Sequence, residues 1–144
     1  MPALSQTLTF IINNARTTVL NYPNPETEAL EYTSIPVKGE GYFGGTDGVH
    51  TLQTNISDFI GIIEMQGTIA SAPTELDWFP IKLGTNVLTL DTTGAIVDSD
   101  IDSAEYTQAT TEIKTYKIIG NFIWIRANVS EWTEGTVNNI RINH

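Results

Sequence analysis

Apolar and polar residues alternate with a period of two along much of this chain, and no long stretch follows the period of a helix. The pattern is plainest in FIWIRANV, residues 122–129, where Ile123, Ile125, Ala127 and Val129 fall on one face. Side chains two positions apart share one face of a strand, so these four are expected to point into a core. The chain is therefore predicted to be all-β.

Turn-forming residues separate short strand patterns along the whole chain. Hairpins are expected between residues 4–12 and 17–22, and again between residues 86–90 and 95–97. Residues 78–83 are predicted to form a strand at a sheet edge or at a bulge, because Pro80 has no N–H to donate to a neighbouring strand. We predict a single antiparallel β-sandwich, jelly-roll-like, with about nine short strands and no substantial helix; a closed barrel is the alternative.

The length and composition indicate one domain. At 144 residues the chain can bury a core of its own, and it has no cysteine, so packing must supply its stability. We expect a single β-sandwich domain over residues 1–144. Within it, residues 1–37 carry the N-terminal hairpin and a connection rich in proline and glutamate, and residues 38–144 carry the main strands.

A longer strand is expected from Phe59 onward. Phe59, Ile63, Met65 and Ile69 fall on one face, and the opposite face begins apolar before it turns polar. This pattern is typical of a central strand that is buried on both sides at its start.

Two glycines, Gly61 and Gly67, share the apolar face of this strand and leave gaps on it. A large side chain is expected to cover each gap. Trp78 and Phe79 are the nearest candidates in the sequence.

The charge balance excludes some partners. Acidic residues outnumber basic ones by 17 to 7, a formal net charge of −10, so binding to a nucleic-acid backbone is not expected. The first residues lack a basic start followed by an apolar run, and no segment is long and apolar enough to cross a bilayer. We expect neither a signal peptide nor a membrane partner, and we expect synthesis in the cytoplasm.

Few residues could support catalysis. The imidazoles are His50 and His144, and the sequence DGVHT places Asp47 close to His50. A serine beside this pair could form a hydrolytic site, but no nucleophile motif accompanies it. We interpret His50 as a structural residue that hydrogen-bonds the glycine-rich turns, and we expect no catalytic residues.

The sequence DSDID alternates Asp98, Asp100 and Asp102. An EF-hand loop would need glycine and glutamate where Ser103 and Ala109 stand, so that interpretation fails. A looser calcium site in a loop stays open. No metal ligand set and no cofactor site is predicted.

An outward-facing row of large side chains is the candidate contact surface. Phe122, Trp124 and Arg126 share the face opposite the predicted core, and Tyr42 and Phe43 lie among glycines that form tight turns. Aromatic residues and arginine are enriched at interface centres, and aromatic residues also suit sugars. An interface, a ligand face and an internally covered face are all compatible with the pattern.

Several motifs recur in an order that is familiar from one group of proteins. They are GYFGGTDGVHT, FIGIIEMQGTIA, DWF, GNFIWIRANV and GTVNNI. From residue 39 to residue 142 the chain resembles a family of small β-rich virion structural proteins and repeated domains of tailed bacteriophages, especially myophages of marine cyanobacteria.

The resemblance implies a non-enzymatic structural component of the virion, serving as a tail, baseplate or neck accessory or as a capsid decoration protein. It further implies a homo-oligomer that binds other virion proteins. A glycan- or receptor-binding module on a phage particle, contacting host surface glycans, is the alternative. A hydrolase built around His50 is the third and least favoured hypothesis.

Overall fold

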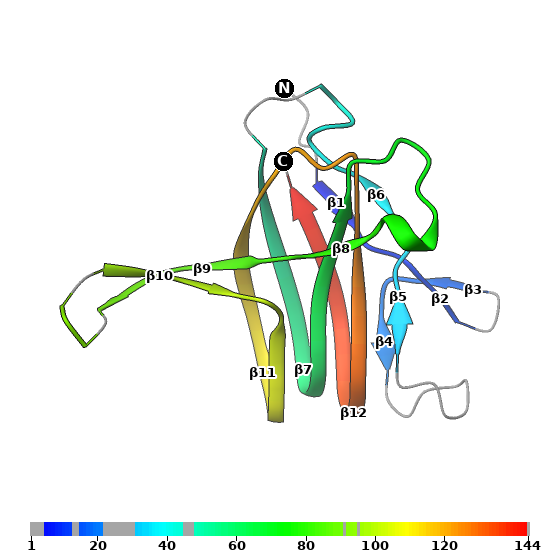
Figure 1. Ribbon diagram of the computed structural model, residues 1–144. Helices are drawn as coiled ribbons and strands as arrows, with labels where there is room; N and C mark the ends of the chain where they lie inside the picture. Colours follow the sequence, from blue (N-terminus) through cyan, green and yellow to red (C-terminus); the bar gives the residue numbers. More distant parts are fainter. Residues whose placement is uncertain are drawn as a thin grey trace.

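The computed structural model describes residues 5–12, 15–21, 31–44, 48–90, 92–94 and 96–143. Its elements are β1 (Ser5–Thr7), β2 (Phe10–Ile12), β3 (Ala15–Thr17), β4 (Leu20–Asn21), β5 (Tyr32–Thr33), β6 (Val37–Lys38), β7 (Val49–Thr68), η1 (Glu75–Asp77), β8 (Phe79–Ile81), β9 (Leu83–Leu90), β10 (Ile96–Ile101), β11 (Ala104–Ile119) and β12 (Trp124–Asn143). Every strand pair is antiparallel (Figure 1).

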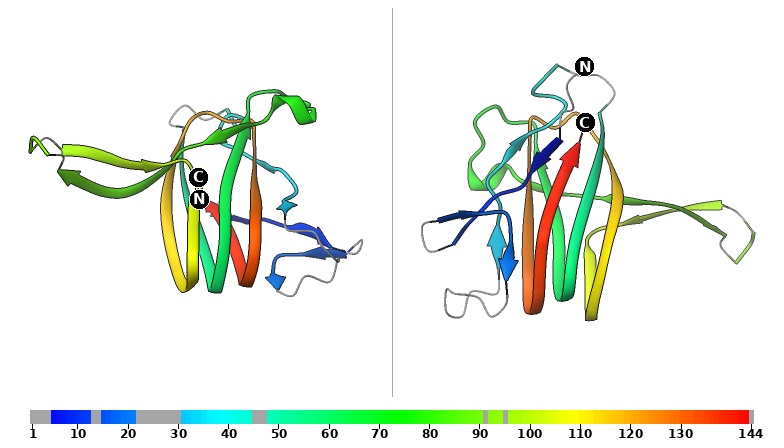
Figure 2. Two further views of the ribbon diagram at one scale, coloured as in Figure 1. Left: turned by 60° about the horizontal axis from the view of Figure 1, so that its bottom comes forward. Right: turned by 180° about the vertical axis from the view of Figure 1, so that it is seen from behind.

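Three long strands build the body of the protein. β7 and β12 have 20 residues each and β11 has 16. Each runs along one layer, bends sharply at the same end of the molecule and returns in the other layer (Figures 1 and 2). β7 lies between β12 and β11 in the sheet order. The all-β, antiparallel, sandwich-like class is confirmed, although the main strands are longer than the short ones we predicted.

The sheet does not close on itself. Its order among the described strands is β1-β12-β7-β11-β9-β10, which leaves two ends instead of a barrel. The described helical residues amount to the single 3₁₀ turn η1.

A bulge at the bend of β7 keeps apolar side chains pointing inward on both sides. Leu52 and Ile56 are buried before the bend, whereas Phe59 and Ile63 are buried after it, so the inward positions change from even to odd numbers. Asp58 lies at the change and has a positive φ of 50°. An extra residue in this conformation shifts the alternation by one position, so the strand passes between layers without exposing its core face.

The bend of β12 is built in a similar way. Glu131 and Gly135 have positive φ values of 49° and 84°, and the register with β7 shifts between Ser130 and Glu134. Trp132 lies inside this bend, is fully buried, and donates a hydrogen bond from Nε1 to the carbonyl oxygen of Gly135 at 3.0 Å. The tryptophan therefore holds the bend closed from within.

In β11 a tyrosine links the two sides of the bend. The Tyr106 hydroxyl donates to Oε1 of Glu112 at 2.7 Å and lies 3.4 Å from the hydroxyl of Tyr116. Burial, together with hydrogen bonds to Tyr116 and Glu112, raises the pKa of Tyr106 well above its ordinary value. The neutral phenol is thus the form that fits the fold.

We expect this tyrosine to make the fold sensitive to alkaline conditions. The folded state holds the proton of the Tyr106 hydroxyl more tightly than the unfolded state does. The stability that this neutral hydroxyl contributes is therefore complete below about pH 10 and is lost as the pH rises above that value. Urea unfolding at about pH 8 and about pH 11 should show a larger loss of stability in the wild type than in Tyr106→Phe. Equal losses in the two proteins would contradict this role.

The N-terminal strands cover one edge of the sandwich. β1, β4, β5 and β6 all pair with β12, through Gln6↔Ile142, Leu20↔Val137, Tyr32↔Val129 and Val37↔Ile125 among others. Leu8 and Phe10 are fully buried in the same core as the long strands. The predicted hairpin between residues 4–12 and 17–22 is present only in part, because β2 and β3 pair with each other, whereas β1 and β4 of the same ranges pair with β12. Residues 22–30 of the proline- and glutamate-rich connection lie outside the described residues.

Two glycines of β7 are covered, but by other residues than we predicted. A Cβ at Gly67 would meet Ile81 and Phe122, and one at Gly61 would meet the ring of Phe59. Phe79 is opposite Gly67 in the register but stays 41% exposed. Trp78 covers neither glycine. Ile69, expected on the inward face, is 73% exposed because β7 ends before it.

The strands after β7 leave the body of the sandwich. β8 pairs with β7 alone among the described strands, as the edge-strand prediction required. β9 and β10 form the predicted hairpin, with Leu90 opposite Ile96, and project well beyond the sandwich as an arm (Figures 1 and 2). We call the segment from Leu83 to Ile101 the β9–β10 arm.

Candidate functional site

Four of the five predicted contact residues come together on the outer side of β12. The ring of Tyr42 lies 5.4 Å from the ring of Trp124 and 5.6 Å from that of Phe43. Tyr42 and Phe43 are 46% and 49% exposed, and Trp124 is half-buried. Lys38 adds its ammonium 4.4 Å above the ring of Tyr42.

The predicted arginine is held in place by its neighbours. The Arg126 guanidinium stacks 4.2 Å from the ring of Trp78, and its Nε donates to Oε1 of Gln66 at 2.8 Å. A salt bridge of 3.3 Å joins it to Glu75, and the arginine side chain is only 11% exposed. Arg126 therefore mainly braces Trp78 and η1 against β12. We call Lys38, Tyr42, Phe43, Trp78, Trp124 and Arg126 the aromatic face.

Trp124 is fixed by a hydrogen bond as well. Its Nε1 donates to the carbonyl oxygen of Ser71 at 3.0 Å, so its polar edge is used within the chain. What the aromatic face offers a partner is ring surface, chiefly from Tyr42 and Phe43, with the Lys38 charge beside it. Such surfaces bind apolar side chains or the apolar faces of sugars.

Phe122 does not belong to this face, and that prediction is wrong. Its side chain is only 8% exposed and packs against Gly67, with the ring of Phe79 at 5.6 Å and that of His50 at 6.4 Å. β12 begins at Trp124, so the alternation that we extended back to Phe122 had not yet begun.

Lys38 and Trp78 are members of the face that sequence reasoning missed. Neither lies in a periodic pattern that points outward, and Trp78 meets Arg126 across a long stretch of chain. The signal available was the DWF motif itself, a tryptophan next to a proline-containing edge strand.

His50 has the structural role that we predicted. It is buried, and its Nε2 accepts a hydrogen bond of 3.0 Å from the backbone N–H of Glu40 in the glycine-rich turn. A buried ring that orders a turn is not placed as an exposed general base. Asp47 and His144 lie outside the described residues.

Replacing His50 by alanine should destabilise the fold by about 2 to 4 kcal/mol, because it removes an acceptor and leaves a cavity. His50→Gln, which retains a hydrogen-bond acceptor, should recover part of this loss. Chemical denaturation of the two variants measures the difference. A His50→Ala protein as stable as the wild type would contradict the structural role.

The two aspartates of the DSDID sequence whose side chains are described, Asp100 and Asp102, do not converge on a metal site. Asp102 forms an exposed ion pair with Lys82 at 3.7 Å, and Asp100 is exposed on β10. The side chain of Asp98 is not among those that the structure describes. Among the residues whose side chains are described, no group of three or more acidic or histidine residues could hold a metal ion.

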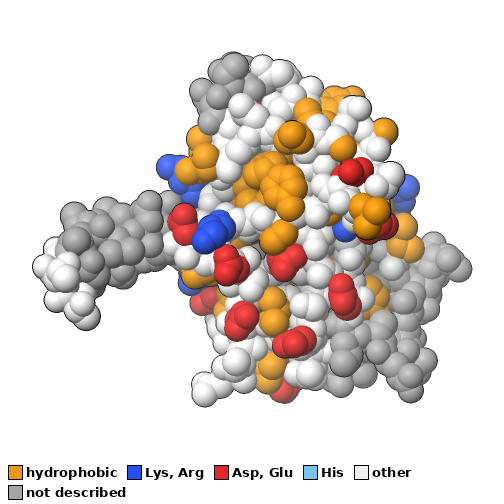
Figure 3. Space-filling model, in the orientation of Figure 1, with side chains coloured by type: hydrophobic (Ala, Val, Ile, Leu, Met, Phe, Trp, Pro, Cys, Tyr) orange, Lys and Arg blue, Asp and Glu red, His pale blue; other side chains and the backbone are white. Residues whose placement is uncertain are grey.

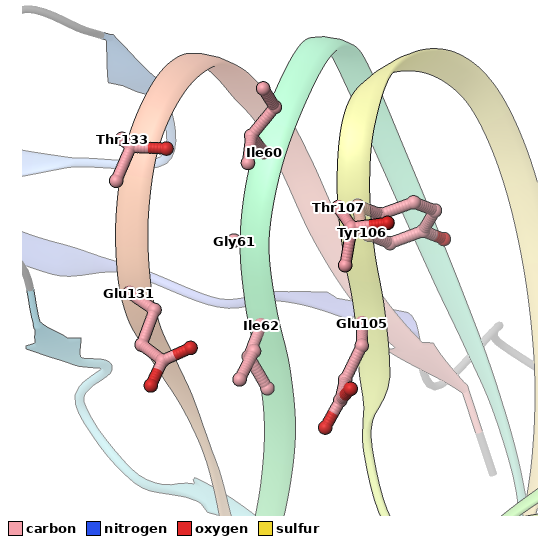
Figure 4. Close-up of a pocket in the computed structure, with 8 residues that line it drawn as sticks. All are labelled: Ile60, Gly61, Ile62, Glu105, Tyr106, Thr107, Glu131 and Thr133. Atoms are coloured by element: carbon pink, nitrogen blue, oxygen red, sulfur yellow. The ribbon is translucent and has the colours of Figure 1, made fainter.

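A hollow of about 480 Å³ lies on the outer side of the layer that contains the second half of β7. It is lined by Ile60, Gly61, Ile62, Glu105, Tyr106, Thr107, Glu131 and Thr133. Figure 4 shows Ile62 between the carboxylates of Glu131 and Glu105, and Ile60 between two threonines. Both glutamates are exposed, so the hollow is an open surface feature. The apolar start of this strand face was its signal in the sequence.

The aromatic face and the hollow occupy different parts of the surface. Figure 3 shows apolar side chains gathered around the region of β8 and η1, whereas Asp and Glu side chains are spread over the lower part of the same face. Ile69 and Leu76, which are 73% and 95% exposed, extend the apolar surface beside the aromatic face. The upper region is therefore the better candidate for contact with an apolar partner.

Comparison of the chain with protein-family models, with curated proteins and with solved structures finds no match. Within the part of the chain that the structure describes, no helix has the length and apolar character needed to cross a membrane.

Proposed function

We propose that this protein is a non-enzymatic structural component of a tailed-phage virion, located in the particle, that associates with copies of itself and binds a neighbouring virion protein. The virion part of this proposal rests on the motif resemblance. A position in the tail, baseplate or neck is favoured slightly over capsid decoration. The structure supports the general part of the proposal, a role based on protein contacts.

The observation that carries the proposal is the β9–β10 arm. It projects from the sandwich with no described strand beside its outer length (Figure 1). A two-stranded hairpin is marginally stable alone, so a partner strand beside this arm would stabilise it. A projecting arm of this kind can reach a neighbouring protein.

Light scattering during size exclusion, over a wide concentration range, tests the self-association. We expect a mass that rises to a defined oligomer. Binding to particles that lack the protein, followed by electron microscopy, tests the neighbour contact. A strictly monomeric protein that binds no such particle would overturn the proposal.

A glycan- or receptor-binding module is the second candidate, and the aromatic face favours it. Exposed rings of Tyr42 and Phe43 beside the Lys38 ammonium can stack on a sugar and contact its hydroxyls. Rings held by neighbouring contacts lose little freedom on binding, which lowers the cost of association.

An array of bacterial surface glycans tests this second function. Binding should fall sharply in a Tyr42→Ala and Phe43→Ala double variant, and it should persist in Ile113→Ala, which changes a 62% exposed residue on β11. No signal from the wild-type protein would count against this module.

A further inference from the structure

β9 and β11 are neighbours in the sheet order, yet they share a single residue pair, Lys117↔Gly84. Beyond Gly84, β9 runs away from the sandwich with β10 as its partner on the other side (Figure 1). β11 pairs with β7 along one side, and from Ala104 to Tyr116 its other side has no partner among the described strands. β9 beyond Gly84 and β11 from Ala104 to Tyr116 therefore each have one open edge, on the side where the two strands are neighbours in the sheet order.

At the opposite end of the sheet, the strand edge is covered. The edge of β12 is covered by β1, β4, β5 and β6 from the N-terminal part of the chain. An uncovered edge exposes a row of backbone N–H and C=O groups that can pair with another chain. The open side of the protein is thus the side of β11 and β9.

Charge makes a second copy of this chain a suitable partner for that side. The protein carries a formal charge of −10, so most of its surface repels another copy. β9, LGTNVLTL, contains no charged residue. β11 contains two glutamates, Glu105 and Glu112, and two lysines, Lys114 and Lys117, which cancel. The two open edges belong to neutral strands in an acidic protein.

We propose that β9 of one copy pairs with the open edge of β11 in a second copy, and that the two copies exchange this contact reciprocally. The inference rests on the self-association in the proposed function and names the segments responsible. A reciprocal contact closes a two-fold dimer. β9 has eight residues, about 26 Å of extended chain, and the 16 residues of β11 are long enough to receive it.

The absence of cysteine from the chain allows a direct crosslinking test. One preparation carries Thr92→Cys at the tip of the arm, and a second, with a tag of different mass, carries Thr107→Cys or Thr115→Cys on β11. All three positions are exposed. After mixing and mild oxidation, we expect a mixed disulfide dimer with one of the β11 positions. Ala72→Cys, at an exposed position near η1, serves as the control partner.

A shortened arm gives an independent measurement. Replacing residues 85–99 by Asn-Gly keeps the pair Gly84↔Asp100 and closes it with a two-residue turn. Circular dichroism checks that this variant folds, and light scattering measures its mass. Losing several backbone hydrogen bonds should weaken dimerisation by at least about tenfold.

The outcomes separate the inference from the proposed function. A wild-type dimer that persists unchanged in the shortened variant, with no excess of crosslinks over the Ala72→Cys control, would overturn the β9–β11 contact and leave self-association standing. A wild-type protein that is monomeric at every concentration would overturn both. If the shortened variant does not fold, the crosslinking test on the intact arm decides.

Discussion

Replacing Gly135 by alanine is expected to lower the free energy of unfolding by about 3 to 5 kcal/mol, among the largest effects of any single methyl group in this protein. Gly135 has a φ of +84°, which strains any L side chain, and a Cβ there would collide with the backbone carbonyl of Asp58. The Cα of Phe59 would lie 2.6 Å away. Backbone cannot move aside as the end of a flexible side chain can, so the bends of β12 and β7 would have to separate.

Gly94→Ala is the matched control for this prediction. Gly94 has nearly the same φ, +87°, but a Cβ there would meet nothing within 4 Å. The Gly94→Ala substitution should lower the free energy of unfolding only by the backbone strain, about 1 to 2 kcal/mol. Chemical denaturation of both variants separates the collision from the strain. Equal losses at the two positions would show that the close approach of the two bends does not matter.

Replacing Trp132 by alanine is expected to cost about 3 to 5 kcal/mol, the range for large buried aromatic residues. Trp132 is fully buried and is the largest such side chain. Its ring meets that of Tyr32 edge to face at 5.8 Å, and its Nε1 hydrogen-bonds the carbonyl of Gly135. The substitution would empty the inside of the β12 bend and free a buried carbonyl.

Two further substitutions make this second prediction specific. Trp132→Phe retains most of the ring but loses the N–H, so it should cost less than alanine. Trp124→Ala removes a half-buried tryptophan from the aromatic face and should cost less than Trp132→Ala. Denaturation followed by circular dichroism ranks the three variants. If Trp124→Ala proved the most damaging, the bend would not be the critical packing site.

Sequence reasoning reached the fold class and several local elements. It predicted the hairpin of β9 and β10 and the edge position of β8, and it placed Ile125, Ala127 and Val129 in the core. Each of these depends on alternation or on turn residues within a few positions of one another, which are local effects.

The length of the long strands could not be predicted from such local patterns. The strand that we expected from Phe59 onward begins at Val49, because Asp58 forms a bulge within one continuous strand instead of ending it. A bulge and a turn use similar residues, and only the pairing with distant strands distinguishes them.

The candidate contact surface was predicted in part. Tyr42, Phe43, Trp124 and Arg126 lie together, whereas Phe122 is buried. Their role in binding stays a prediction.

By itself, the sequence determined that this protein is all-β, that it is acidic, and which short segments alternate, because these properties follow from composition and nearest neighbours. Only the tertiary structure decided that three strands bend to supply both layers, that Arg126 is held against Trp78, and that the edge of β11 is open. Each of these depends on contacts between residues far apart in the chain, and a periodic pattern carries no information about which distant partner a strand or side chain will meet.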